Sequence, residues 1–233
     1  MEETTPRESR KITCGGKEYI ERCVEILTRL FVDDPVMMWL MCDTGAPGSQ
    51  EMHRARYGFF SAIFRAAAMN KGRFIEINDF ASCALVMPPG EKADNPWTMI
   101  QAGIIPALWT VGFGGMKRVL FEYADTCHHM LPKVFNTEEQ QNHWYIIIIG
   151  TELDRRRKGL ASDILGYIKD LARKDGRPVW IESTTETSRD LYVKNGFTEL
   201  DDVVVLGQGK VGSDGIPKKN GEGVTIRCLY WRP

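Results

Sequence analysis

The chain has 233 residues, of which 43% are hydrophobic and 26% are charged. This mixture is that of an ordinary globular domain, and it excludes a disordered or fibrous protein. The formal net charge of −1 provides no global field that would attract nucleic acid or an anionic membrane surface, so we expect neither as a partner. The length suits one large domain over residues 1–233.

The cysteines are spread over the whole chain, and no two have the two-residue spacing of a zinc or redox motif. We therefore expect free thiols in a reducing compartment and no bound metal. Residues 1–11 are polar and lack the apolar core of a signal peptide, and the apolar runs are too short to cross a bilayer. These features predict a cytoplasmic protein. The six cysteines are Cys14, Cys23, Cys42, Cys83, Cys127 and Cys228.

Helices and a hairpin are predicted for the first 90 residues. Apolar residues recur at helical spacing over 17–30, and Asp33–Asp34–Pro35 ends or bends that helix. Ser49 is the predicted N-cap of a long helix that stops before the Asn70–Lys71–Gly72 turn. The expected elements are helices over 17–30 and 50–69, a helical turn over 36–41, and strands over 74–77 and 82–87 joined by a tight turn at 78–79.

Residues 91–142 form the least regular stretch, for which we expect two short helices, over about 97–111 and 114–130. Its aromatic side chains are interleaved with glycines, and such side chains more often belong to a core than to a pocket. His128 and His129 are adjacent, so in a helix they diverge by about 100°, and no metal site with His143 is expected. The aromatic residues of this stretch include Trp97, Trp109, Phe113, Phe121, Tyr123 and Phe135.

The second half of the chain alternates strands and helices. Four successive isoleucines in the strand over 143–150 predict a strand that is buried on both faces. Leucines and isoleucines at helical spacing follow over 159–174, and Asp175–Gly176 ends that helix. The remaining elements are strands over 179–183, 203–206 and 224–231, a short helix over 187–195, and a glycine-rich loop before the last strand.

The loop between the isoleucine-rich strand and the next helix carries the clearest chemical signal. The first turn of a helix has unpaired N–H groups and a partial positive charge, which together suit a pyrophosphate. Gly159 and Ala161 leave room for a ligand near the backbone, and residues 155–158 add four positive charges. Those charges oppose the helix dipole, which favours a bound anion; a solvated basic loop is the alternative. Neither a P-loop nor a Rossmann fingerprint is present.

Two motifs in this region resemble those of a known family. Arg156-x-x-Gly159-x-Ala161 resembles the Q/R-x-x-G-x-G/A motif of the GNAT superfamily of acyl-CoA-dependent N-acetyltransferases. Residues 191–197 resemble its second landmark, L-Y-x-x-x-G-F, and the strand over 143–151 resembles its fourth strand. The resemblance is strongest over the cofactor motifs at 143–200. Residues 31–35 also resemble a puromycin-acetyltransferase-like branch.

The resemblance implies an α/β (α+β) fold with a central, twisted, mixed but mostly antiparallel sheet of about seven strands flanked by helices. It also implies acetyl-CoA as co-substrate and no metal. The strand before the loop would splay from its neighbour, so that its backbone pairs with the pantetheine arm and polarises the thioester carbonyl. The residues expected to bind the coenzyme are Ile149, Gly150, Thr151, Arg156, Arg157, Lys158, Gly159, Leu160, Ala161, Ser188 and Tyr192.

Acyl transfer from a thioester needs alignment, a general acid and a general base, but no enzyme nucleophile. Tyr192 matches the family's general acid; packing of the short helix is its alternative role. His143 is a candidate base, since it lies on the same strand face as Tyr145. A hydrogen-bonded histidine at the edge of the sheet is the alternative, and Glu182 and Glu76 are rival bases.

The expected function is transfer of an acetyl group from acetyl-CoA to a primary amine of a small molecule by direct attack on the thioester. Residues 91–142 form an insert on the substrate side and are expected to shape the acceptor site. One alternative is an enzyme of the same class that acts on protein lysine or on an N-terminal amine. Another is a non-catalytic coenzyme-A-binding module. A monomer or homodimer is expected.

Overall fold

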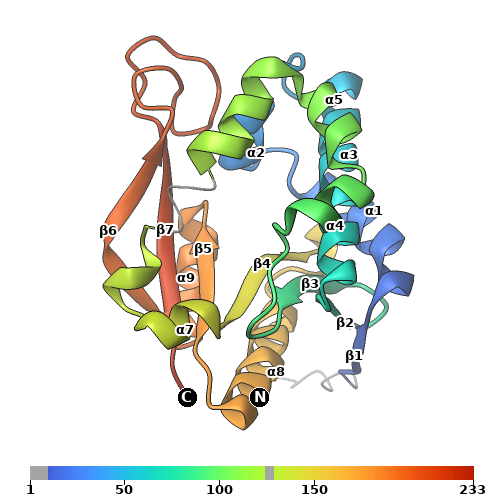
Figure 1. Cartoon of the computed structure of the whole chain (residues 1–233), viewed down its shortest axis with the longest axis vertical. Coiled ribbons are helices and arrows are strands. Elements are labelled where there is room, and N and C mark those ends of the chain that lie inside the picture. The colour runs from blue at the N-terminus through green and yellow to red at the C-terminus, as the bar shows by residue number, and fades with distance from the viewer. Residues whose placement is uncertain (1–9, 124–128) are drawn as a thin grey trace, which may run out of the picture.

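The computed structural model describes residues 10–123 and 129–233, which form a central sheet with helices on both faces (Figure 1). The strands are β1 (Ile12–Gly15), β2 (Arg73–Ile77), β3 (Ser82–Met87), β4 (Trp144–Thr151), β5 (Val179–Ser183), β6 (Thr198–Leu206) and β7 (Val224–Trp231). The helices are α1 (Ile20–Leu30), α2 (Pro35–Leu40), α3 (Gln50–Met69), α4 (Pro96–Gln101), α5 (Ile104–Lys117), α7 (Thr137–Gln141), α8 (Leu160–Asp175) and α9 (Glu186–Lys194). Short helical turns are η1 (Lys17–Tyr19), η2 (Arg118–Tyr123), η3 (Leu131–Lys133) and η4 (Leu153–Arg155).

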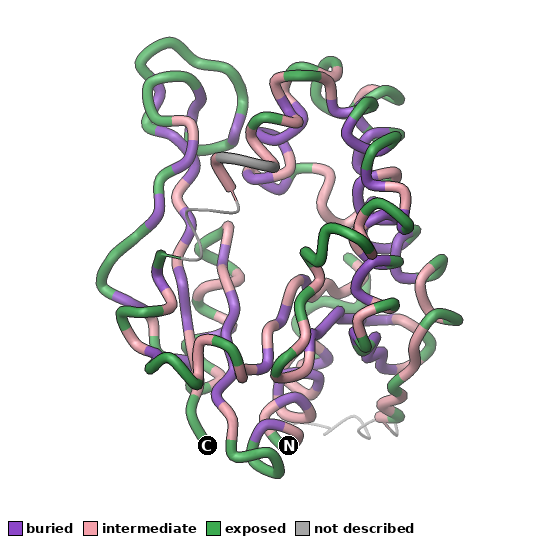
Figure 2. Tube along the Cα trace, in the orientation of Figure 1, coloured by how far each residue is buried: buried purple, intermediate pink, exposed green. Residues whose placement is uncertain are grey.

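The described strands form a seven-stranded sheet in the order β1-β2-β3-β4-β5-β7-β6. Neighbours are antiparallel except β4 and β5, which are parallel and joined through the crossover helix α8. Alternate residues of β2 and β3 pack into two cores, one shared with α1 and α3 and the other with α8. Buried positions therefore recur along the strands and on the inner sides of the helices (Figure 2). The predicted mixed, mostly antiparallel sheet flanked by helices is confirmed.

β4 and β5 separate partway along their length. Parallel pairing ends at Ile146 and Ile181, whereas β4 continues to Thr151. On the β3 side, the register shifts by one residue at Ile147, which is a β-bulge. Bulges bend strands and often lie beside functional sites. Within the described chain, no strand pairs with residues 147–151 on the β5 side, so this edge of β4 has no strand partner.

The prediction that the isoleucine-rich strand is buried on both faces is wrong. Trp144, Ile146 and Ile148 are buried, but Tyr145 and the residues at 147 and 149 are only partly buried. The reason is that Tyr145 and Ile147 pack at the border of the core that β2 and β3 share with α1 and α3, so this face of β4 is only partly covered.

Local signals set several boundaries as predicted. The Ser49 hydroxyl accepts a hydrogen bond from the Met52 N–H at 3.2 Å and caps α3, and β3, β5 and β7 have the expected bounds. The predicted two-residue turn at 78–79 is wrong: the turn includes Phe80, and residues 78–80 all have left-handed φ angles of 54° to 61°. The Glu76 carboxylate accepts the Phe80 N–H at 2.8 Å and holds this turn.

The insert at 91–142 departs most from the prediction. Gly103, with φ 92°, separates α4 from α5, and α5 is kinked at Gly112, where φ is 75°. Residues 114–123 of the helix predicted over 114–130 are helical, as the end of α5 and the π-helical turn η2, whereas residues 129–130 form a turn. Cys127 and His128 lie outside the described residues.

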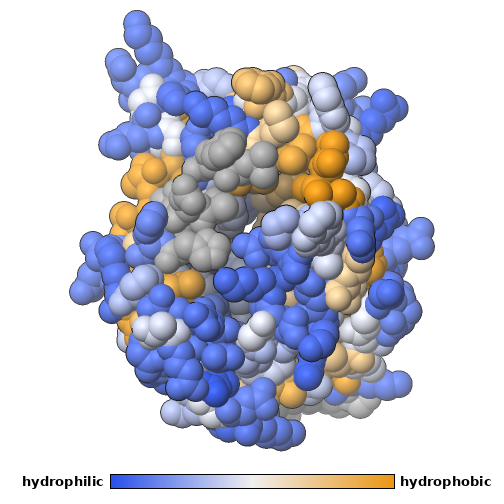
Figure 3. Space-filling model, in the orientation of Figure 1, coloured by the Kyte–Doolittle hydropathy of each residue, from blue (hydrophilic) through white to orange (hydrophobic). Residues whose placement is uncertain are grey.

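The aromatic side chains of this insert are mostly not in the core. Trp97, Trp109 and Phe113 are 76%, 81% and 82% exposed, which corrects the expectation that they belong to a core; Phe135 is buried. Ile105, 51% exposed, lies one helical turn before Trp109 on the outer side of α5, and Phe113 follows directly after the kink at Gly112. Apolar side chains accordingly gather at the α4–α5 end of the surface (Figure 3).

The loop of residues 207–223 packs closely on α2. A Cβ on Gly215 would lie 2.1 Å from the Pro35 carbonyl oxygen, and one on Gly207 would lie 2.6 Å from Trp39 Nε1. Both glycines have left-handed φ angles. Small residues are therefore required where this loop holds α2 in place, and α2 carries Asp34 at its N-terminus.

The described part of the chain contains five cysteines, and all five are free thiols. None of the helices described there is long and apolar enough to cross a membrane. The same residues contain no cluster of three or more histidine, cysteine or carboxylate side chains that could hold a metal ion.

Candidate active site

The loop from β4 to α8 presents a row of unpaired backbone amides. Gly159 is the N-cap of α8, with φ 82° and no capping side chain, and Arg157 also has a left-handed φ of 61°. Among the described residues, no acceptor receives a hydrogen bond from the N–H groups of residues 157–162. Consecutive amides at a helix N-terminus, with the positive end of the dipole behind them, form a cradle for a phosphate or diphosphate.

The basic side chains of this loop stand around the amides. Residues 155–158 are exposed, and Arg156 Nε donates to the Thr151 carbonyl at 3.3 Å. Leu160 is buried in the core against the sheet, so its N–H, not its side chain, faces the loop's ligand side. The loop therefore combines backbone donors with mobile cations at its rim, which suits an anion larger than a single phosphate.

The end of β4 lies directly under α1. A Cβ on Gly150 would lie 2.7 Å from Leu27 Cδ2 and 3.0 Å from Leu30 Cδ1. The Gly150 carbonyl accepts the Ser82 hydroxyl at 2.8 Å, and the Ser82 and Thr151 hydroxyls are 2.9 Å apart. These contacts fix the backbone of the strand end at Ile149, Gly150 and Thr151, which the resemblance led us to expect at the coenzyme.

Tyr192 lies on α9 and is 5% exposed. Burial raises the pKa of its hydroxyl well above the ordinary value, and the nearby carboxylates Asp34 and Glu182 raise it further. Within the described chain, no protein group forms a hydrogen bond with this hydroxyl. The phenol is therefore protonated at neutral pH and available as a donor, as a general acid requires.

Asp34 is a site residue that the sequence did not single out. Its carboxylate accepts the N–H groups of Val36 and Met37 at 3.1 and 3.0 Å, so it caps α2, and it also accepts the Thr184 hydroxyl. Burial raises its pKa, although these hydrogen bonds and the charge of Arg56 oppose that effect. Asp34 thus joins α2 to the end of β5 beside Tyr192.

The buried Arg56 holds the segment that carries Asp34. It is 1% exposed, and its guanidinium donates to the carbonyl of Thr28 at 2.9 Å and to that of Val32 at 3.4 Å. Burial lowers the pKa of Arg56, and the nearby Asp33 and Asp34 oppose that shift. An arginine from α3 therefore caps the end of α1 and places a positive charge behind the site.

Glu182 is the second carboxylate near Tyr192. It lies on β5 one residue beyond Ile181, the last residue paired with β4, and accepts Trp180 Nε1–H at 2.5 Å. It is only partly buried. It lies just past the point where the pairing of β4 and β5 ends.

The other predicted site residues lie elsewhere or are engaged. His143 precedes β4, its Nδ1 is 2.9 Å from the Glu139 carbonyl oxygen, and it is roughly 20 Å along the strand from Gly150. Glu76, on β2, holds the hairpin turn. The Ser188 hydroxyl lies 2.6 Å from that of Ser183 at the start of α9. Of the predicted bases, Glu182 is the one whose charge raises the pKa of Tyr192; His143 and Glu76 do not contribute to that shift.

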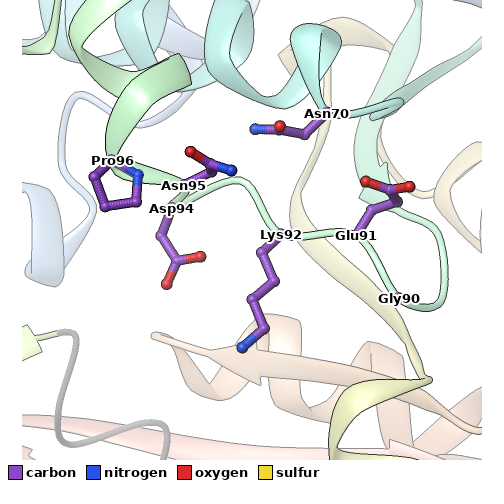
Figure 4. Close-up of a pocket in the computed structure, with 7 residues that line it drawn as sticks. All are labelled: Asn70, Gly90, Glu91, Lys92, Asp94, Asn95 and Pro96. Carbon is purple, nitrogen blue, oxygen red and sulfur yellow. The ribbon is translucent and has the colours of Figure 1, made fainter.

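A separate polar pocket of about 460 Å³ lies between the end of α3 and the loop before α4 (Figure 4). It contains none of the candidate site residues of this subsection, and one of its carboxylates, Glu91, pairs with Lys71 at 2.6 Å. We therefore do not assign the chemistry to it. Its lining residues are Asn70, Gly90, Glu91, Lys92, Asp94, Asn95 and Pro96.

The raised pKa of Asp34 leads to a stability prediction. Below the aspartate value of about 3.9, the carboxyl group is protonated in both the folded and the unfolded state. As the pH rises through the higher folded-state pKa, ionisation is disfavoured in the folded protein and stability is lost. Asp34→Asn keeps a capping oxygen but does not titrate. Urea unfolding from pH 4 to 7 should show the variant gaining stability relative to the parent protein; a constant difference would contradict this.

Comparison with known proteins indicates the fold and the class of enzyme. No family model matches the chain. An uncharacterised N-acetyltransferase of Schizosaccharomyces pombe is 25% identical over 182 residues, which cover 78% of this chain and 71% of the relative. Arylalkylamine N-acetyltransferase 2 from Aedes aegypti matches with a TM-score of 0.56 at 15% identity. The match covers 94% of this chain and 98% of the Aedes aegypti chain. The polyamine N-acetyltransferase of Drosophila melanogaster has a TM-score of 0.54 at 10% identity, with coverages of 96% and 100%.

These similarities show that the chain has the fold of the GNAT acetyltransferases. The yeast relative, which is matched by sequence, supports an N-acetyltransferase as the class of enzyme. The expected fold and enzyme class are thereby confirmed.

Proposed function

We propose that the protein transfers an acetyl group from acetyl-CoA to a primary amine of a small molecule. The observation that carries this proposal is the row of free amides at residues 157–162, placed where β4 separates from β5. In this proposal the amides and the basic side chains around them hold the diphosphate of the coenzyme. The open backbone of residues 147–151 pairs with the pantetheine arm and directs the thioester toward Tyr192.

Tyr192, Glu182 and Asp34 have three different roles in this proposal: general acid, general base and supporting carboxylate. As the amine attacks the thioester carbon, the C–S bond breaks and the Tyr192 hydroxyl gives its proton to the departing thiolate. Glu182 takes the proton from the amine, because it is only partly buried and its charge acts on Tyr192, whereas Asp34 is 9% exposed. Asp34 keeps α2 and Thr184 in place and adds negative charge that attracts a cationic amine.

A small acceptor is favoured by the apolar side chains beside the separated ends of β4 and β5. Tyr145 and Ile147 on β4, and Phe31 after α1, are partly buried apolar residues on that side of the sheet. The proteins with the same fold are named for arylalkylamines and polyamines, which are small amines. We extend that substrate class to this chain. Transfer to a protein lysine or N-terminal amine, and coenzyme binding without catalysis, are the competing functions. The puromycin-acetyltransferase-like branch, a cytoplasmic location and a monomeric or homodimeric state also remain proposals.

The test is release of free coenzyme A thiol from acetyl-CoA in the presence of single amines. The panel contains arylalkylamines, polyamines, and peptides with one lysine or one free N-terminus. We expect turnover with at least one small amine and none with the peptides. Turnover with peptides alone would favour the protein-directed enzyme, and coenzyme binding without turnover across the panel would favour the non-catalytic module.

A further inference from the structure

Arg10, just before β1, reaches the coenzyme loop from the opposite end of the chain. Its Nη2 donates to the Lys158 carbonyl at 2.7 Å, and its Nη1 donates to the Asp163 carboxylate. The side chains of Arg10 and Asp163, which form this ion pair, are only 24% and 29% exposed. A Cβ on Gly159 would lie 3.3 Å from Arg10 Nη1. The guanidinium therefore lies against the backbone of the loop, between a carbonyl and the first turn of α8.

We propose that Arg10 is a positioning residue that holds this loop in its coenzyme-binding conformation; the inference rests on the proposed function. In a trans peptide unit, the C=O and the next N–H point in opposite directions. The Lys158 carbonyl points at Arg10, so the Gly159 N–H points away from it, to the side where the other free amides meet the diphosphate. Without Arg10, this peptide unit can turn and present a carbonyl oxygen, which repels an anion.

Arg10 also neutralises a charge that opposes coenzyme binding. Asp163 lies in the first turn of α8, close to the amides that face the diphosphate. An ionised carboxylate there repels phosphate, and the ion pair with Arg10 cancels that repulsion. Arg10 thus acts on the coenzyme through two neighbours, the Lys158 carbonyl and the Asp163 carboxylate.

The test compares a donor with phosphates and a donor without them. In calorimetric titrations with acetyl-CoA, the donor with phosphates, Arg10→Ala should raise Kd by about tenfold to a hundredfold, as expected for the loss of hydrogen bonds to a charged group. Arg10→Lys keeps the charge but not the two-pronged geometry, and should give a smaller loss. The KM for acetyl-pantetheine, which has no phosphate, should be unchanged in both variants, whereas a general folding defect would raise it as well.

Two further variants complete the test. Arg22→Ala breaks an exposed ion pair with Glu25 on α1 and should leave both donors unaffected. Asp163→Asn added to Arg10→Ala should recover part of the lost affinity. Coenzyme affinity in Arg10→Ala equal to that of the parent protein, or equal losses for both donors, would overturn the role of Arg10 alone. Failure of the parent protein to bind coenzyme A would instead overturn the proposed function.

Discussion

Replacing Tyr192 with phenylalanine is expected to lower kcat by about 10² to 10⁴-fold, the range typical of a lost general acid. The Kd of acetyl-CoA should change little, because the ring remains in its place against Phe197, 6.1 Å away between centroids. Burial and the two neighbouring carboxylates raise the pKa of the Tyr192 hydroxyl, so the group stays protonated across the neutral range. Its ionisation should therefore cause no fall in kcat between pH 6 and 9.

Stopped-flow or steady-state thiol release, with acetyl-CoA binding measured separately, checks this expectation. Tyr167→Phe is the matched control, since Tyr167 is a partly buried tyrosine on α8 that packs on the same core. It should retain the parent kcat. If Tyr192→Phe also retained it, the phenol would be a packing residue and the proton would come from solvent or from another group.

Gly159→Val is expected to weaken coenzyme A binding by about tenfold or more. A β-branched residue at φ 82° costs roughly 1–2 kcal/mol in the left-handed region, and a tenfold loss corresponds to about 1.4 kcal/mol. The added Cβ would also approach Arg10 Nη1 to 3.3 Å. Both effects move the loop out of the conformation in which its amides converge.

The opposite end of the same helix supplies the control for this variant. Gly176 is the C-cap of α8, has φ 63°, and has open space where a Cβ would be. Gly176→Val therefore introduces comparable backbone strain without touching the loop. Calorimetric Kd values should separate the two variants, and equal effects would show that strain in α8, not the loop geometry, controls affinity.

The elements that the sequence predicted well are those with a local cause. α3 has its N-cap at Ser49 and a helical apolar stripe, and the α8 region has glycines at both ends together with the motif that marks the coenzyme loop. The proposed role of Tyr192 comes from the same kind of signal, a motif within one segment. Such signals need no knowledge of distant residues.

The features that were missed depend on residues far apart in the chain. Arg10 meets Asp163 across 153 positions, and Asp34 meets Thr184 across 150, so one sequence contains no sign of either contact. The Asp-Pro pair was recognised as a helix stop, but not as the cap of α2 beside a site. For His143, the two-residue strand period gives the face of β4 but not the distance from the loop. For Trp97, Trp109 and Phe113, the apolar character of the side chains favoured a core but could not tell that they face solvent.

Amide chemical shifts during a titration with coenzyme A test the coenzyme site most directly. In ¹H–¹⁵N spectra of the parent protein, we expect the largest changes at the N–H groups of residues 157–162, with smaller ones along 147–151. The amides around Asn70 and Asn95, at the separate polar pocket, should not move. Saturable binding of coenzyme A with the amides of 157–162 unmoved would contradict the coenzyme site and the function proposed from it.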